Sequence, residues 1–196
     1  MFANRFTALL DANVLVPALG RNLLLSLAEA ELFRPRWSVR IMDETSRAIA
    51  GILERKADTD PVGSAARAIE AMRRAFPEAE VAGFEAFETA LANLPDPGDA
   101  HVIAAAKQTA ASIIVTENIK DFPLSVLEPL GLEAKPADAF IADTIDLDTG
   151  TSVQAVARMR ARFRSPAIGP AALLLLMEAR GLGEAADMLR PHEGSL

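Results

Sequence analysis

Five acidic side chains occupy positions from which a folded chain of this sequence could gather them for chemistry. Asp11 directly follows a short apolar run at 6–10, and Glu44 lies at the start of the helical segment after another short run at 37–41. Two open the helical segment that precedes a second apolar run at 112–116, and one follows that run. In an open parallel sheet, ligands bind beyond the carboxyl ends of the strands. We therefore expect these acids at one sheet edge: Asp11, Glu44, Asp96, Asp99 and Asp121.

Such a cluster would need a cation or protons to be stable. Two carboxylates about 4 Å apart repel each other by about 4 kcal/mol at an effective dielectric constant of about 20. The chain has no cysteine and only two histidines, so its donors are hard oxygens. Such donors favour Mg²⁺ or Mn²⁺ over zinc or copper. A hard cation that retains bound water is suited to phosphodiester hydrolysis.

Each acid also has a structural interpretation. Asp96 can cap a helix, and Asp99 can complement the helix dipole. Glu44 can be a first-turn acid, and Asp121 can be a turn residue. Asp11 fits such an interpretation least, because an acid at the end of an apolar strand rarely serves packing alone. The joint pattern therefore carries more weight than any single member.

The elements that must position these acids alternate between short apolar runs and helical segments. This order indicates an α/β fold with a parallel sheet covered on both faces. Strands are expected over 6–10, 37–41, 80–84 and 112–116, with Pro35 interrupting the chain before the second of them. Helices are expected over 17–33, 43–56, 62–75, 84–91, 97–110 and 123–130.

The end of the chain is expected to be helical. Helices are expected over 136–143, 150–163, 168–180 and 182–189. We therefore divide the chain into a main domain, residues 1–135, and a C-terminal helical extension, residues 136–196.

The net charge of −7 is distributed unevenly. Residues 1–144 hold 21 acidic and 14 basic residues, whereas residues 145–196 hold six of each. This acidity argues against binding nucleic acid through net charge alone, and favours binding through a metal at one acidic pocket. The absence of cysteine, of a membrane-spanning run and of a targeting segment predicts a cytoplasmic protein without membrane association.

Four motifs in this order resemble the PIN-domain nucleases, and within them the VapC-type toxins of bacterial toxin–antitoxin pairs. The matching segments are LLDANVL at 9–15, Asp43-Glu44, DPGDAHVIAAA at 96–106 and VTENIKDF at 115–122. The resemblance covers about residues 5–130. The helical tail is similar to a C-terminal extension found in a subset of VapC-like proteins.

The resemblance implies a Rossmann-like PIN domain and an endoribonuclease that depends on Mg²⁺ or Mn²⁺. By position, the acidic quartet corresponds to Asp11, Glu44, Asp99 and Asp121, with Asp96 as an additional acid beside the third. All five are then candidate metal ligands. The resemblance also implies an RNA substrate, a protein antitoxin as partner and a homodimer.

Other polar residues are expected to support this site. The resemblance assigns Thr116 and Asn118 as partners that orient the acids, and Asn13 is expected to support the loop after the first strand. His101 is expected to be a helix residue near the site rather than a ligand. Six arginines near the expected mouth could contact RNA phosphates or could be ordinary surface charges: Arg5, Arg21, Arg34, Arg36, Arg40 and Arg47. The candidates chosen for RNA binding are Arg36, Arg40 and Arg47.

Other functions stay open at this stage. The chain could be a housekeeping PIN-type nuclease for RNA processing, or a catalytically silent module that binds RNA or protein. A silent module predicts missing acids, yet all four quartet positions are filled. A third alternative is a phosphatase with a nucleophilic aspartate on a similar fold. Such enzymes usually have a second acid two residues after the first. Here that position is Asn13, which counts against a phosphatase.

Overall fold

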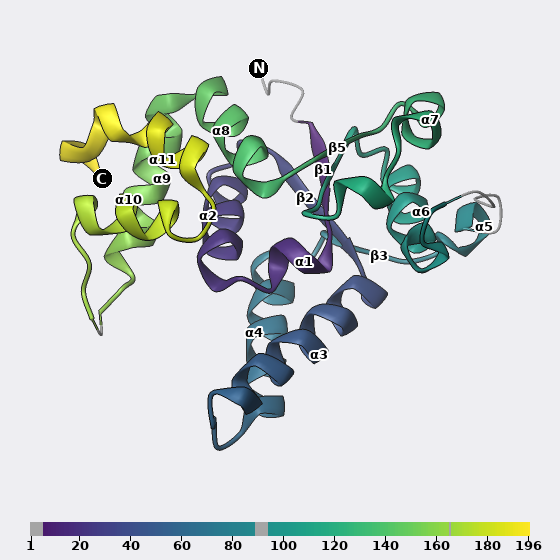
Figure 1. The fold of residues 1–196 in the computed structure, drawn as a ribbon, viewed down its shortest axis with the longest axis horizontal. Coiled ribbons are helices and arrows are strands. Elements are labelled where there is room, and N and C mark those ends of the chain that lie inside the picture. The colour runs from purple at the N-terminus through teal and green to yellow at the C-terminus, as the bar shows by residue number, and fades with distance from the viewer. Residues whose placement is uncertain (1–5, 89–93, 165) are drawn as a thin grey trace.

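A parallel sheet forms the centre of the molecule (Figure 1). The computed structural model describes residues 6–88, 94–164 and 166–196. Within these residues the strand order is β3–β2–β1–β4–β5, and every neighbouring pair is parallel. The strands are β1 (Thr7–Leu10), β2 (Arg34–Ser38), β3 (Glu80–Val81), β4 (Ile113–Val115) and β5 (Glu133–Lys135). The expected α/β fold with a central parallel sheet and flanking helices is thereby confirmed.

Helices follow most of the strands and cover the sheet. Those of the main domain are α1 (Ala12–Leu15), α2 (Ala18–Glu29), α3 (Val39–Arg55), α4 (Pro61–Ala75), α5 (Glu85–Glu88), η1 (Pro97–Asp99), α6 (Ala100–Gln108), η2 (Ile119–Asp121), α7 (Leu124–Leu127) and η3 (Glu128–Leu130). Figure 1 shows α2 and α6 on opposite sides of the sheet, while the α3–α4 hairpin projects from the molecule. Because the two central strands are covered in this way, Leu9, Leu10 and Val115 are fully buried.

The prediction of a strand over 37–41 is wrong in its bounds, because β2 begins three residues earlier, at Arg34, and ends at Ser38. It includes Pro35, which was expected to interrupt the chain. Trp37 donates its amide hydrogen to Ala79 on the β3 side, and alternation along a parallel strand places Pro35 on that same side. The short β3 pairs only with Trp37 and Ser38, so the missing N–H of Pro35 leaves no gap in a ladder.

The early end of β2 moves the following helix. The hydroxyl of Ser38 accepts a hydrogen bond from the amide of Ile41 at 3.1 Å, so α3 begins at Val39 rather than near residue 43. Glu44 consequently lies in the second turn of α3 and not in the first. Such a cap satisfies one of the free amides that every helix start exposes.

Two further differences concern the edges of the sheet. The strand expected at 80–84 is shortened to the two residues of β3, and β5 was not expected at all. Its sequence, Glu133-Ala134-Lys135, lacks the branched and aromatic residues typical of strands. Residues 85–88 of the helix expected at 84–91 form α5, and the end of that helix lies outside the described residues.

All four helices expected in the extension are present. They are α8 (Ala137–Leu147), α9 (Thr149–Ala161), α10 (Pro170–Glu178) and α11 (Gly183–Leu189), followed by η4 (Arg190–Ser195). Phe140 of α8 packs edge-on against Phe33, with ring centres 4.9 Å apart, and against Phe6 at 5.9 Å. Aromatic pairs at such distances add to the stabilisation from burial alone. The extension therefore shares one continuous apolar core with the main domain.

The apolar segment near residue 173 belongs to this core. Leu173, Leu174 and Met177 of α10 are buried, whereas Leu175 is largely exposed. In the described part of the chain, no helix combines the length and the apolar character that crossing a membrane requires.

Candidate active site

Asp11 stands at the carboxyl end of β1, where its side chain caps the short helix α1. One carboxylate oxygen accepts the amide hydrogen of Ala12 at 2.6 Å. The other accepts hydrogen bonds from the Thr116 hydroxyl and the Asn13 side-chain amide, both at 2.7 Å. Burial raises the pKa of Asp11, and these three hydrogen bonds oppose that rise. The carboxylate is thus held in one orientation although it is buried.

Asn13 and Thr116 tie this carboxylate to the segment after β4. The Asn13 amide nitrogen also donates to Thr116 Oγ1 at 2.9 Å, and its oxygen accepts the amide hydrogen of Glu117 at 3.0 Å. Thr116 Oγ1 further accepts the backbone amide of Asn118 at 3.1 Å. The hydroxyl therefore uses its one donor and both acceptor positions. All three residues predicted as supporting lie in this network, Asn118 through its backbone.

Asp96 and Asp99 lie at the start of α6 and differ in their contacts. Asp96 accepts the amide hydrogen of Gly98 at 2.7 Å and caps η1, as its structural interpretation requires. The Asp99 side chain, by contrast, makes no capping hydrogen bond. Its pKa is raised to about 6, first by burial and then by negative charge on four other side chains: Asp11, Asp96, Asp121 and Glu44. The four other predicted acids therefore all lie within electrostatic reach of Asp99.

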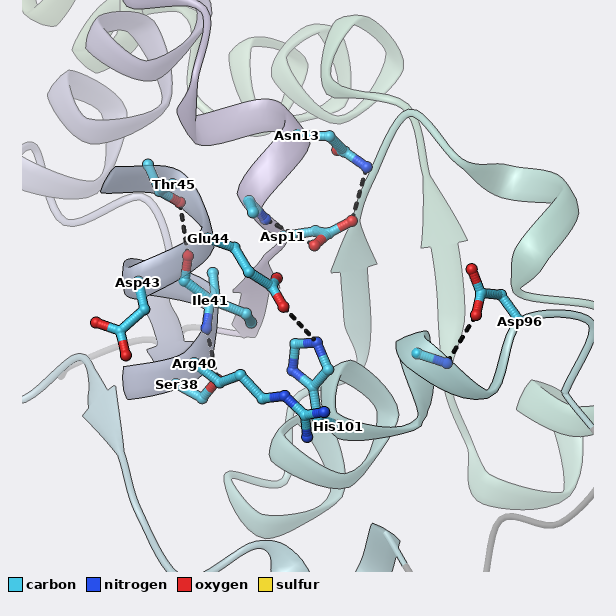
Figure 2. Close-up of polar contacts among 12 residues, drawn as sticks. Asp11, Asn13, Ser38, Arg40, Ile41, Asp43, Glu44, Thr45, Asp96 and His101 are labelled. Atoms are coloured by element: carbon cyan, nitrogen blue, oxygen red, sulfur yellow. Dashed lines mark hydrogen bonds and ion pairs between the residues drawn. The ribbon is translucent and has the colours of Figure 1, made fainter. Parts of the chain in front are cut away.

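Glu44 approaches this group from α3, and Figure 2 shows its carboxylate between Asp11 and His101. Its Oε1 lies 3.3 Å from Nε2 of His101. Burial raises the pKa of Glu44, as does the charge of Asp11, while Arg40 and Arg47 lower it. The neighbouring Asp43 points away from Asp11 in Figure 2, so only one of the two adjacent acids joins the cluster.

His101 is a site residue that the sequence did not reveal as a contact of Glu44. Its side chain is 2% exposed, and burial, followed by repulsion from Arg40, lowers its pKa to about 4. The imidazole is therefore neutral at pH 7 and can donate one N–H toward Glu44. The only signal was its position two residues after Asp99, which places His101 in the first turn of α6 while Asp99 is the N-cap of that helix.

The three predicted arginines have different surroundings. Arg40 pairs with Glu88 at 2.8 Å, and Arg47 donates to the backbone carbonyl of Asp43 at 3.3 Å. Both act on the pKa of Glu44, so both lie on the α3 side of the acids. Arg36 instead donates to the carbonyl of Glu78, in the loop before β3. The structure thus does not bring Arg36 to the cluster.

Arg21 contacts the end of α1 that lies away from Asp11. The guanidinium of Arg21, on α2, donates to the carbonyls of Leu15 at 2.7 Å and Val16 at 3.2 Å. These carbonyls end α1, the helix that begins at Asp11. A cation at a helix C-terminus offsets the partial negative charge of its free carbonyls. Arg21 therefore holds the far end of the helix that Asp11 caps.

The donor set fits a hydrated hard cation. Repulsion between Asp99 and the four other acids is the cost that a divalent cation would offset. In residues 6–88, 94–164 and 166–196, no three or more Asp, Glu or His side chains lie together in a group that could hold a metal ion. Mg²⁺ is usually held by only one or two carboxylates and keeps several waters, so it does not require such a group.

Comparisons with known proteins agree with this architecture. The family model of the PIN domain matches residues 7–120, and that of the VapC50 C-terminal domain matches residues 137–191. A Mycobacterium tuberculosis protein named "Putative ribonuclease VapC50" is 36% identical over 76 residues, which are 39% of this chain and 45% of that protein. The match thus spans less than half of this curated relative. No solved structure matches the chain.

Proposed function

Since the chain belongs to the PIN-domain family by its match over residues 7–120, we propose that it is a metal-dependent endoribonuclease. The observation that carries this proposal is the position of Asp99. Four other carboxylates act on its pKa, one directly after β1, one on α3, one directly before η1 and one in η2. Segments far apart in the sequence therefore place acids together at a cost to folding, as a functional site would require.

Asp11 and Asp99 are the residues that would hold Mg²⁺ or Mn²⁺, with Glu44, Asp96 and Asp121 completing the coordination or orienting water. When bound, such a cation offsets charge on the phosphate and lowers the pKa of a bound water. The Asp11 carboxylate cannot turn away without losing three hydrogen bonds. The protein thus keeps at least one ligand oriented before any cation arrives.

Glu44 is the best candidate to accept a proton from the attacking water. The pKa of Glu44 is raised toward neutral pH, so its carboxylate accepts a proton more readily than an ordinary glutamate does. The neutral His101 beside it can donate a hydrogen to the charged carboxylate and hold its orientation. The proposed reaction is direct hydrolysis of an RNA phosphodiester, without a covalent enzyme intermediate.

The proposal extends to the biological setting. The segment similar to the VapC50 C-terminal domain and the name of the relative support a toxin of a toxin–antitoxin pair. Its partner would be a protein antitoxin, and the active form would be a homodimer. We assign the nuclease to residues 1–135 and the helical extension to residues 136–196.

A cleavage assay tests the activity directly. We expect the purified protein to cut RNA with Mg²⁺ or Mn²⁺ and to lose this activity with EDTA and in Asp11→Asn. Cleavage that needs no metal and persists in Asp11→Asn would refute the proposed site. Intact RNA under all conditions would favour a module that only binds.

Expression in bacteria tests the biological role. We expect growth arrest that is relieved by co-expression of the neighbouring open reading frame. Active cleavage without any toxicity would contradict the toxin assignment and favour a housekeeping nuclease. The two assays separate the chemical proposal from the biological one.

A further inference from the structure

A cavity of about 230 Å³ lies where the extension meets the main domain. Its walls come from α1, α2, the segment after β4, the start of α8 and the turn between α10 and α11. The lining residues are Val14, Pro17, Leu19, Gly20, Glu117, Ala137, Arg180, Gly181 and Leu182. The two ionisable groups on this wall, Glu117 and Arg180, come from the two different parts of the chain.

The cavity is joined to the acidic cluster by a short chain of hydrogen bonds. The amide of Glu117 donates to Asn13, and the Asn13 side chain donates to Asp11. Val14, which also lines the cavity, follows Asn13 in α1. The cavity therefore lies close to the acidic cluster, with Asn13 bonded to residues of both.

Its polar groups have unused binding capacity. Arg180 is exposed, and the described residues provide no ion pair or hydrogen bond for its guanidinium. One oxygen of Glu117 accepts the amide hydrogen of Ala137 at 3.2 Å, which leaves the other oxygen available. A guanidinium suits a phosphate and a carboxylate suits an amino group, while the other walls are largely apolar.

Gly20 supplies an independent observation. It lies in the first turn of α2 and lines the cavity. A Cβ at this position would have no atom within 4 Å, so the protein itself does not fill the space beside Gly20. The missing side chain of Gly20 thus leaves this part of the cavity open.

We infer that this cavity binds the base of an unpaired RNA nucleotide next to the cleaved phosphodiester, with Arg180 on the adjoining phosphate. The inference rests on the proposed nuclease function. Glu117 accepts hydrogen from an exocyclic amino group, so bases that carry one are preferred over uracil. The extension then takes part in substrate selection, because Arg180 belongs to it.

Steady-state kinetics on a short fluorogenic RNA with one mapped cut site tests this subsite. We expect Arg180→Ala and the cavity-filling Gly20→Met each to raise KM by about five- to tenfold, with kcat within about twofold, because binding is lost equally in the ground and transition states. The matched control is Arg158→Ala, on the exposed side of α9 and away from the cavity. It should leave both constants unchanged.

The base preference provides a second readout. In Glu117→Gln the preference for an amino-bearing base over uracil at the flanking position should fall by about threefold, since a neutral acceptor binds more weakly than a carboxylate. Thermal unfolding of Gly20→Met, beside Gly20→Ala, checks that the fold is kept.

The outcomes are distinguishable. If the wild type cleaves RNA but Arg180→Ala and a folded Gly20→Met leave KM unchanged, the subsite is refuted and the nuclease stands. If Arg158→Ala raises KM as much as Arg180→Ala does, the effect is general charge and the subsite is again refuted. If the wild type does not cleave RNA, the nuclease proposal fails, and the subsite with it.

Discussion

In the C-terminal helices, aspartates hold helix ends. Asp148 accepts hydrogen bonds from the amide and hydroxyl of Thr151 at 2.9 and 2.8 Å, and these lower its pKa. Asp138 of α8 accepts the amides of Glu184 and Ala185, at the start of α11, both at 2.9 Å. Both carboxylates thus have hydrogen-bond donors at the start of a helix as partners.

At the carboxyl edge of the sheet, by contrast, the aspartate Asp99 lies near other acidic side chains. Asp99 makes no capping hydrogen bond, and its pKa is raised to about 6 by burial and by four other acids. Acids that meet amide donors stabilise the fold, whereas acids that meet acids create repulsion that a proton or a cation must relieve. The comparison sets Asp99 apart from Asp138 and Asp148, whereas Asp11 and Asp96 of the candidate site combine amide donors with a place near other acids.

The largest expected effect follows from exchanging one aspartate in each region. Asp99→Asn should reduce metal-dependent RNA cleavage by at least about a hundredfold, since even outer residues of metal sites cost up to that much. Asp148→Asn should keep activity, because asparagine caps helices as well as aspartate does. Single-turnover cleavage at saturating Mg²⁺ measures both. Equal losses in the two variants would contradict the distinction between the regions.

Two buried threonines sharpen the same comparison at smaller amplitude. Thr116→Val removes the donor to Asp11 and the acceptor of Asn13 and Asn118, so cleavage should fall by about ten- to a hundredfold. Thr144, equally buried, only donates to the carbonyl of Phe140 within α8. Thr144→Val should leave kcat unchanged, and the prediction fails if both variants lose activity alike.

Removal of a capping aspartate should affect stability instead. Asp138→Ala leaves two amides at the start of α11 without their acceptor, so the free energy of unfolding should fall by about 1–2 kcal/mol. Chemical denaturation in EDTA measures this change. Asp99→Asn under the same conditions should be neutral or stabilising, because it removes a repelled charge. A loss of stability in Asp99→Asn would count against repulsion at the sheet edge.

The smallest expected effect is a pH dependence. The pKa of Asp99 is about 6 in the folded protein and has an ordinary value of 3.8. Between pH 3.8 and about pH 6, Asp99 therefore binds more protons in the folded state than in the unfolded state. The contribution of Asp99 to the free energy of unfolding falls as the pH rises through this window.

Asp99→Asn removes this contribution. Without metal, the stability of the variant relative to the wild type should increase from pH 4 to pH 7 by about 1 kcal/mol, after allowance for solvent screening. Denaturation curves at several pH values test this. Parallel stability profiles of the two proteins would exclude it.

The positions of the site acids relative to the strands could be predicted because they depend on local sequence patterns. Asp11 follows an apolar run that forms β1, and Asp121 follows another that forms β4. Helices of the extension were also predictable, since their apolar spacing and caps are local signals. β2 was misplaced because the effect of Pro35 depends on how far β3 extends beside it, and no local pattern contains that information.

Contacts between distant segments were beyond the reach of the sequence in the same way. The approach of His101 to Glu44 depends on how α6 and α3 lie across the sheet, and the turn of Arg36 toward Glu78 depends on the loop before β3. Arg180 likewise lines a cavity with Gly20 only because the extension packs beside α2.

Sequence alone determined the type of chemistry available: hard oxygen donors, no thiolate, scarce imidazole and acids at the ends of strands and the starts of helices. Tertiary structure decided which of these acids face one another and which face amide donors. The physical reason is that residue type sets the charge a side chain can carry. Its surroundings, which are assembled from segments over a hundred residues apart, as Asp11 and Thr116 are, decide whether that charge is stabilised or repelled.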